Sequence, residues 1–493
     1  MSRYPTAIFL LLLTAAALLV HGYHPFAEDA EIYLPGAEKI LNPKLFPVGQ
    51  EFFASHASLT IFPNLVAASL RITHLPMEIG LFVWHVASIF LLLLACWELS
   101  GVLFSTPPAR WGAVCLIAAL FTIPVAGTAL YIMDQYLVPR NLTAFAVIFA
   151  VTRTLEKKYV RAAAWLAFAA CIHPLMTSFA FSLCLLLVVM EMFENREARA
   201  TRAQPASAAL CFLLPFGISL DPPSSRAYHE AAMRHGFHYI QLWQWYEWLG
   251  ILAPVLLFWW FARIARTRGW RLLNHICRAL IIYDLVYFTA ALIVDFPARF
   301  ESLARLQPLR SLHLLYMLMF VVMGGLLGEF VLKNRVWRWL ALFVPLAAGM
   351  YLAQRALFPA SAHVEWPGRV PRNPWAQAFV WVQKNTPLDA VFALDPTYMQ
   401  IPGEDAIGFR CLTQRSRLAD AIKDSGAVSM FPPMAEEWWA QVQAQTPWKN
   451  FQAEDFARLR EKYGVTWVVV QQLGVTRLEC PYQNATVRVC RVP

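Results

Sequence analysis

An acidic cluster near the N-terminus holds the first side chains that could perform chemistry. The segment FAEDAEIYLP places Glu28, Asp29 and Glu31 close together, a few residues after an apolar stretch. Neighbouring carboxylates raise each other's pKa, which suits a general base or a metal-assisted one. A solvated acidic loop is the competing interpretation, and this segment alone does not decide between the two.

Three further segments carry polar side chains at the edges of apolar stretches. They contribute Asp134, Gln135, Arg140 and Asn141 in MDQYLVPRN, His173 and Pro174 in IHPLM, and Gln307 and Arg310 in LQPLR. A guanidinium group holds two phosphate oxygens at once, so Arg140 and Arg310 are candidates for binding a phosphate. Ionisable residues at helix ends also act as interfacial anchors, which is the alternative for each segment taken alone.

Several common chemistries have no motif in this sequence. It contains no Walker-type Gly-rich loop, no paired CxxC and no HExxH, which argues against ATP hydrolysis, a zinc ribbon and a zincin. The net charge is +9, but residues 357–493 carry 14 Lys/Arg and 13 Asp/Glu, so nearly all the excess lies in the first 356 residues. That distribution is typical of membrane topology, and it predicts no nucleic-acid partner.

The elements that must position these residues are membrane helices. Hydrophobic residues make up 58% of the chain, charged residues 15%, and the mean hydropathy is +0.46. The long apolar runs lack the alternation of a membrane barrel, so they predict helices. We expect about eleven spans, at residues 6–21, 78–98, 112–131, 141–153, 161–172, 175–192, 206–220, 249–266, 276–294, 309–332 and 337–355. The pair around His173 and Pro174 is short enough to be one broken helix or a re-entrant pair.

Loop charges orient these spans. With the N-terminus in the cytoplasm, the inner segments hold 17 Lys/Arg, more than the longer outer loops. The positive-inside rule therefore predicts a cytoplasmic N-terminus and an exported C-terminus. Counting residues 58–73 as a span would invert the later loops, so we expect an interfacial helix there, with Pro63 at or near a break. The first external loop, residues 22–77, then faces outward together with all three polar segments, which predicts one shared site.

Residues 357–493 have a soluble pattern and predict a small α/β domain on the non-cytoplasmic side, following a transmembrane domain of residues 1–356. Helices are expected at 375–385 and 453–463, and strands at 390–394 and 465–470. Cys480 and Cys490 flank a predicted hairpin and could form a disulfide in an exported domain. Polar residues that follow the first strand read as an acidic surface loop: Asp395, Glu404, Asp405 and Arg410.

The acidic pair after the first helix, the interfacial helix, the many short spans and the exported C-terminal domain together resemble the polytopic glycosyltransferases of the C superfamily. The resemblance implies inverting transfer of a hexosyl or pentosyl group from a polyprenyl-phosphate donor to a cell-envelope lipid, glycan or protein. It also implies a bacterial inner-membrane enzyme in which Asp29, beside Glu28, is the catalytic carboxylate. Topology and chemistry add Arg140, His173 and Arg310, with Asp134 and Gln307, as substrate and phosphate ligands. No metal ligand is assigned, and a divalent metal requirement stays open.

Two other functions fit the pattern. A transporter or flippase of lipid-linked intermediates would also have many short spans, although carriers place their site near the bilayer midplane, often between inverted repeats, and none is visible here. A noncatalytic membrane scaffold would use the exported domain to bind envelope partners.

The aromatic run GFHYIQLWQWYEW at 236–248 predicts an interfacial belt, with a platform for sugar stacking or lipid entry as the alternative.

Overall fold

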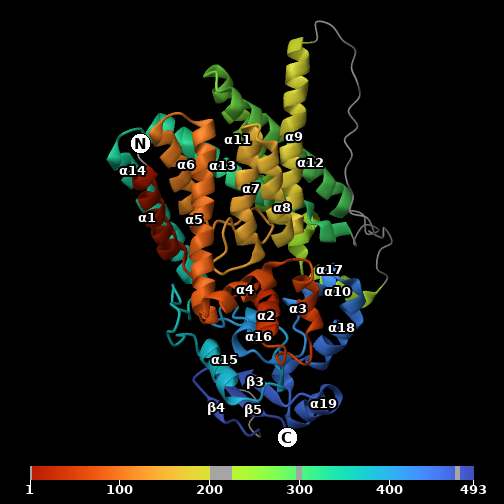
Figure 1. Cartoon of the computed structure of the whole chain (residues 1–493). Coiled ribbons are helices and arrows are strands. Elements are labelled where there is room, and N and C mark those ends of the chain that lie inside the picture. Colours follow the sequence, from red (N-terminus) through yellow and green to blue (C-terminus); the bar gives the residue numbers. More distant parts are fainter. Residues whose placement is uncertain (1–2, 200–224, 296–302, 472–477) are drawn as a thin grey trace.

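The computed structural model describes residues 3–199, 225–295, 303–471 and 478–493. A bundle of long helices occupies one end of the molecule and a small sheet the other, with the short helices of the first loop between them (Figure 1). The described part is mainly helical. Six of its helices are long and apolar enough to cross a membrane: Met77–Leu103, Pro174–Glu194, Trp245–Thr267, Arg271–Asp295, Leu303–Leu332 and Val336–Leu357.

Helices overlap ten of the eleven expected spans, and the remaining one, 206–220, lies outside the described residues. The bundle consists of α1 (Arg3–His21), α5 (Met77–Leu103), α6 (Pro107–Ala119), α7 (Pro139–Leu155), α8 (Tyr159–Ile172), α9 (Pro174–Arg199), α11 (Trp245–Thr267), α12 (Arg271–Asp295), α13 (Ser311–Leu327) and α14 (Val336–Leu357). Because α6, α7 and α8 have only 13, 17 and 14 residues, the count of eleven spans is not confirmed. The prediction of a span at 112–131 is wrong for its second half, because residues 120–138 form a non-helical loop.

Helix α13 lies at the centre of the bundle, where nearly all of its residues are buried. It packs closely against α6 because both helices present glycine at the contact. A Cβ atom on Gly324 would lie 2.4 Å from the carbonyl oxygen of Gly112, so any side chain would force the helices apart. The short helix η4 (Pro308–Arg310) leads into α13 and thereby carries Arg310 to the end of the bundle that faces the first loop.

The first loop folds into three helices: α2 (Ala30–Leu41), α3 (Glu51–Ala57) and α4 (Phe62–Thr73). Helix α4 forms where the interfacial helix was expected, but Pro63 lies in its first turn and not at an internal break. Proline is favoured there because its missing N–H would be unpaired in the first turn anyway. The sequence patterns did not predict α2 and α3.

The C-terminal segment contains α15 (Pro374–Asn385), α16 (Phe409–Thr413), α17 (Asp424–Met430), α18 (Ala435–Ala444) and α19 (Ala453–Tyr463). Its strands are β1 (Val391–Ala393), β2 (Ser416–Arg417), β3 (Trp467–Gln471), β4 (Tyr482–Gln483) and β5 (Val487–Arg491). They form one sheet in the order β2-β1-β3-β5-β4, in which β1 is parallel to β2 and β3. Both predicted helices and both predicted strands form, and a disulfide joins Cys480 to Cys490.

Backbone hydrogen bonds join the first loop directly to the C-terminal segment. The N–H of Glu28 donates to the carbonyl of Ala406 at 2.7 Å, and the N–H of Gly408 donates to the carbonyl of Phe26 at 2.7 Å. Residues distant in the sequence therefore form one layer below the bundle. A domain boundary near residue 357 stays a prediction, because these contacts cross it.

Candidate active site

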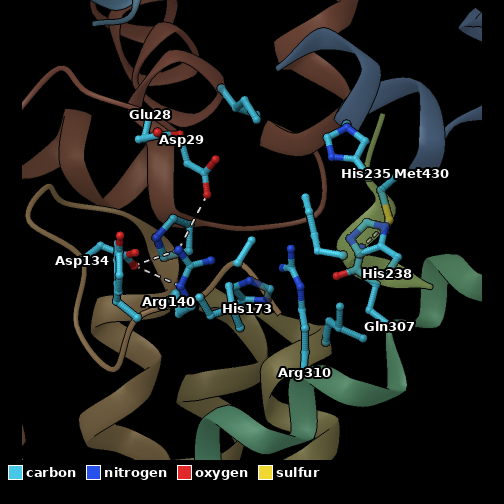
Figure 2. A pocket seen from close by; sticks show the side chains of 18 of the residues that line it. Glu28, Asp29, Asp134, Arg140, His173, His235, His238, Gln307, Arg310 and Met430 are labelled. Carbon is cyan, nitrogen blue, oxygen red and sulfur yellow. Dashed lines mark hydrogen bonds and ion pairs between the residues drawn. The ribbon is translucent and has the colours of Figure 1, made fainter. Parts of the chain in front are cut away.

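A cavity of about 1680 Å³ lies where the bundle, the first loop and the C-terminal segment meet. Its lining includes every site residue expected from the sequence, and these residues come from four separate stretches of the chain: Glu28, Asp29, Asp134, Arg140, His173, Gln307 and Arg310. Figure 2 shows most of these side chains turned toward a common space. The structure therefore brings the seven residues together, and their chemical roles stay predictions.

Asp29 lies directly before α2 and has two cationic neighbours. Its Oδ1 accepts a hydrogen bond from Nζ of Lys423 at 2.9 Å, and its Oδ2 lies 3.6 Å from Nη2 of Arg140. Burial by itself raises the pKa of Asp29, but the charges of Lys423 and Arg140 outweigh it and hold the pKa below its usual range. The carboxylate is therefore ionised at any physiological pH.

Arg140, in the first turn of α7, is fixed by Asp134. Its Nε and Nη2 lie 3.0 and 2.8 Å from the same Oδ2 atom, and both side chains are buried. The Nδ2 of Asn141 donates to the carbonyl of Tyr136 at 2.8 Å and ties down the loop that carries Asp134. This arrangement positions the guanidinium between two carboxylates, those of Asp134 and Asp29 (Figure 2).

Arg310, by contrast, has no counterion among the described residues. Its Nε atom is buried without a hydrogen-bond partner there, and no carboxylate of the described chain lies within ion-pair distance. A partly buried guanidinium without a counterion is costly, so an anion bound beside Arg310 would be stabilised. His173, at the break between α8 and α9, lies between Arg140 and Arg310 in Figure 2.

Lys423 is the most important residue that the sequence patterns missed. Its Nζ donates to Oε2 of Glu28 at 2.5 Å as well as to Asp29, and its own backbone N–H donates to Oδ1 of Asp420 at 2.6 Å. Lys423 precedes α17 in an ordinary stretch, IKDS, with no motif that could have identified it. It stands 394 positions from Asp29 in the chain.

A buried ionic network lies behind Lys423. Arg410 binds both oxygens of Asp424 at 2.7 and 2.9 Å, and Nη2 of Arg417 lies 3.0 Å from Oε1 of Glu31 and also pairs with Asp420. All five side chains are at most 2% exposed. Glu31 therefore faces away from the cavity and connects α2 to the segment that carries Lys423.

The expectation of an acidic surface loop after β1 is wrong. Glu404, Asp405 and Arg410 are all buried. The Oδ2 of Asp405 accepts hydrogen bonds from the N–H groups of Ala360 and Ser361 at 3.0 and 2.7 Å. These carboxylates are buried because they accept hydrogen bonds from backbone N–H groups within the C-terminal segment, a role that the sequence patterns did not indicate.

An apolar arm of the cavity lies along α9 and α12. Its lining includes Leu175, Phe179, Phe181, Leu185, Leu186 and Val189 from α9, and Ile282, Val286, Ala290 and Val294 from α12. From Leu175 to Val189 the helix rises about 21 Å. This arm is long and mainly apolar, with the hydroxyls of Ser182 and Tyr287 hydrogen-bonded to each other, and it suits an extended hydrocarbon chain.

Two histidines line the other side of the cavity, across Arg310 from Arg140 (Figure 2). They are His235 and His238, which follow α10 (Arg226–Met233), and they lie near Gln307 and Met430. His238 belongs to the aromatic run that predicted an interfacial belt, and that prediction missed its place in the cavity. No group of three or more His, Cys, Asp or Glu side chains suited to a metal occurs among the described residues.

No family model matches the chain, and no curated protein matches it in sequence. Among solved structures, the chain is similar to the archaeal oligosaccharyltransferase AglB from Archaeoglobus fulgidus, solved in complex with an inhibitory peptide and a dolichol-phosphate. The similarity covers 95% of this chain and 70% of AglB, with a TM-score of 0.36 and 10% sequence identity. A likeness of this degree does not bear on function, which must follow from the cavity itself.

Proposed function

We propose that the chain is a membrane glycosyltransferase that moves a sugar from a polyprenyl-phosphate donor to an envelope lipid, glycan or protein on the non-cytoplasmic face. One observation carries the proposal: a single cavity joins an ionised carboxylate, an arginine with no counterion in the described part of the chain and a long apolar arm. A polyprenyl-phosphate sugar has three matching parts, namely a reactive sugar, an anionic phosphodiester and a hydrocarbon tail.

The proposed reaction is a single displacement. A hydroxyl of the acceptor attacks the anomeric carbon and loses its proton to Asp29, while the bond from that carbon to the phosphate oxygen breaks. The polyprenyl phosphate leaves with the bonding electrons, and Arg310 and Arg140 stabilise its added charge. Attack opposite the leaving group inverts the configuration at the anomeric carbon.

The cations around Asp29 limit how it can act. Lys423 and Arg140 keep the carboxylate ionised but also make it a weak base. Proton transfer therefore occurs late, once the anomeric carbon has gained positive character and the hydroxyl has become acidic. Lys423 has a positioning role in this proposal, because it holds the carboxylate of Asp29, together with that of Glu28, in place to accept the proton of the acceptor hydroxyl.

The proposed orientation places the cavity on the outer side, with the N-terminus in the cytoplasm of a bacterial inner membrane. The Lys/Arg distribution supports it, and so does the disulfide between Cys480 and Cys490, since disulfides persist in oxidising compartments. A membrane-impermeant thiol reagent applied to intact spheroplasts tests the orientation. It should label these cysteines only after reduction, and labelling that requires permeabilised membranes would overturn the topology.

The decisive experiment incubates the purified chain with a panel of polyprenyl-phosphate sugars, with water in place of the acceptor hydroxyl, and measures released polyprenyl phosphate by mass spectrometry. We expect release with at least one donor and loss of that release in Asp29→Asn. The matched control is Asp389→Asn, an exposed carboxylate outside the cavity. Equal activity of Asp29→Asn and wild type would refute a catalytic Asp29, and would leave a scaffold function as the better explanation.

The same preparation separates the proposal from transport. A flippase reconstituted in liposomes would move the intact lipid between leaflets without releasing the sugar. Movement of intact donor, with no cleavage and no effect of Asp29→Asn, would favour the transporter.

A further inference from the structure

Two buried polar atoms face the cavity on the side of His235 without any partner among the described residues. They are Nε2 of His238 and Oε1 of Gln307, on side chains that are 8% and 6% exposed. The other terminal atom of Gln307, Nε2, has only the sulfur of Met430 at 3.8 Å as a neighbour. A buried polar atom without a hydrogen bond is unfavourable, so a polar ligand that pairs with these atoms would be stabilised.

Three distant segments build this side of the cavity. His235 and His238 follow α10, Gln307 precedes η4, and Met430 ends α17. The rings of His235 and His238 stack with their centroids 5.6 Å apart, and a ring nitrogen of His235 lies 3.1 Å from Oγ of Ser425. The stacked pair fixes the His238 ring, so its free nitrogen has a defined direction.

Both imidazoles in this group are uncharged at neutral pH. Burial is the main cause, and the positive charges of Lys423 and Arg310 add to it, so the pKa of His235 falls to about 4. The pKa of His238 is lowered well below its usual value by burial and by Arg310. A neutral imidazole has one hydrogen-bond donor and one acceptor, and a glutamine amide has both kinds. The group can therefore both donate hydrogen bonds to hydroxyl groups and accept hydrogen bonds from them.

Among the described residues, no carboxylate that lines the cavity belongs to this side. The acidic residues that line the described cavity are Glu28, Asp29, Asp134 and Asp405, and the first three lie across the cavity with Arg140 and Lys423. A cationic ligand group on this side would therefore meet the positive charge of Arg310 with no lining carboxylate beside it. The chemistry favours a neutral group that is rich in hydroxyls.

We infer that His238 and Gln307 form the subsite for the transferred sugar, and that this sugar is neutral, with free hydroxyls and no amino group. This inference rests on the proposed donor class and adds the identity of its sugar. Figure 2 shows Arg310 between this group and Arg140, so the sugar of a donor whose phosphate is bound at Arg310 reaches His238 and Gln307 with its hydroxyls while its anomeric carbon stays on the side of Asp29. Gln307 lies in the turn before η4 and has a φ of +49°, which is the left-handed backbone region that few non-glycine residues adopt.

Equilibrium binding to the full-length protein in detergent tests the subsite with three probes. The probes are decaprenyl phosphate, a set of decaprenyl-phosphate neutral hexoses and a decaprenyl-phosphate amino sugar. The variants are His238→Ala and Gln307→Met, the second of which keeps the side-chain shape if the first fails to fold. The matched control is Gln443→Met, an exposed glutamine of α18 outside the cavity.

At least one neutral hexosyl donor should bind the wild type more tightly than sugar-free decaprenyl phosphate. Each subsite variant should raise the Kd of that donor about tenfold, as expected for one lost hydrogen bond, and leave the Kd of decaprenyl phosphate unchanged. Equal weakening of both ligands, no weakening of either, or tighter binding of the amino-sugar donor would overturn the subsite. If decaprenyl phosphate itself fails to bind the wild type, the proposed function fails together with the subsite.

Discussion

Replacing Lys423 with methionine removes the ammonium group that lies 2.9 Å from Oδ1 of Asp29. Methionine keeps a long, unbranched side chain, so the substitution tests the charge more than the shape. Asp29 retains Arg140 at 3.6 Å and stays buried enough for desolvation to raise its pKa. The pKa of Asp29 must therefore rise in the variant.

The size of the effect follows from the distance. Two unit charges 2.9 Å apart attract each other by about 6 kcal/mol at an effective dielectric constant of 20 and by about 1.5 kcal/mol in bulk water. The side chain of Asp29 is 28% exposed, so the lower part of this range applies. Even about 1.5 kcal/mol changes the ionisation constant of Asp29 roughly tenfold.

The assay is kcat/KM for donor cleavage between about pH 3 and pH 7, because a tenfold change leaves the pKa of Asp29 no higher than its ordinary value. Because Asp29 acts as a base only when ionised, the wild type should lose no activity toward acid from this group. Lys423→Met should lose activity as the pH falls, whereas Lys384→Met, an exposed lysine of α15, should follow the wild type. If Lys423→Met lowers kcat/KM by the same factor at every pH, Lys423 does not control the ionisation of Asp29 and this reasoning is wrong.

Four further substitutions test the architecture around the cavity. Arg417→Met leaves Glu31 and its neighbouring carboxylates with one guanidinium fewer, and should lower the free energy of unfolding by about 3–5 kcal/mol, measured by thermal melting in detergent. Glu31→Gln should cost much less, because burial already raises the pKa of Glu31 and disfavours its charge; equal losses in the two variants would contradict this. Leu185→Trp should fill the apolar arm and raise KM several-fold for a long-chain donor but not for a short-chain one, and equal effects would refute a tail site there. Gly324→Val should lower the melting temperature strongly, because its Cβ would lie 2.4 Å from the carbonyl oxygen of Gly112; unchanged melting would show that α6 and α13 do not touch.

The long helices could be predicted because a membrane helix is encoded in consecutive apolar residues. Helices α5, α9 and α11 accordingly form close to their expected bounds. The prediction failed after Ala119, where the apolar pattern continues but the backbone leaves the helix. There the N–H of Met133 donates to the carbonyl of Phe121 at 2.9 Å and the N–H of Val125 to that of Leu130 at 2.8 Å. Such hydrogen bonds satisfy a buried loop inside the bundle, and hydropathy cannot detect them.

By itself the sequence indicated which polar residues gather at one end of the helices. Charged groups avoid the hydrocarbon core, so their places along the chain and the Lys/Arg bias indicate one face, and Asp29, Arg140 and Arg310 do line one cavity there. Only the tertiary structure decided what Asp29 meets. Lys423 and His238 reach the cavity through the packing of distant segments on the first loop, and a contact across 394 positions depends on that packing and not on any local pattern.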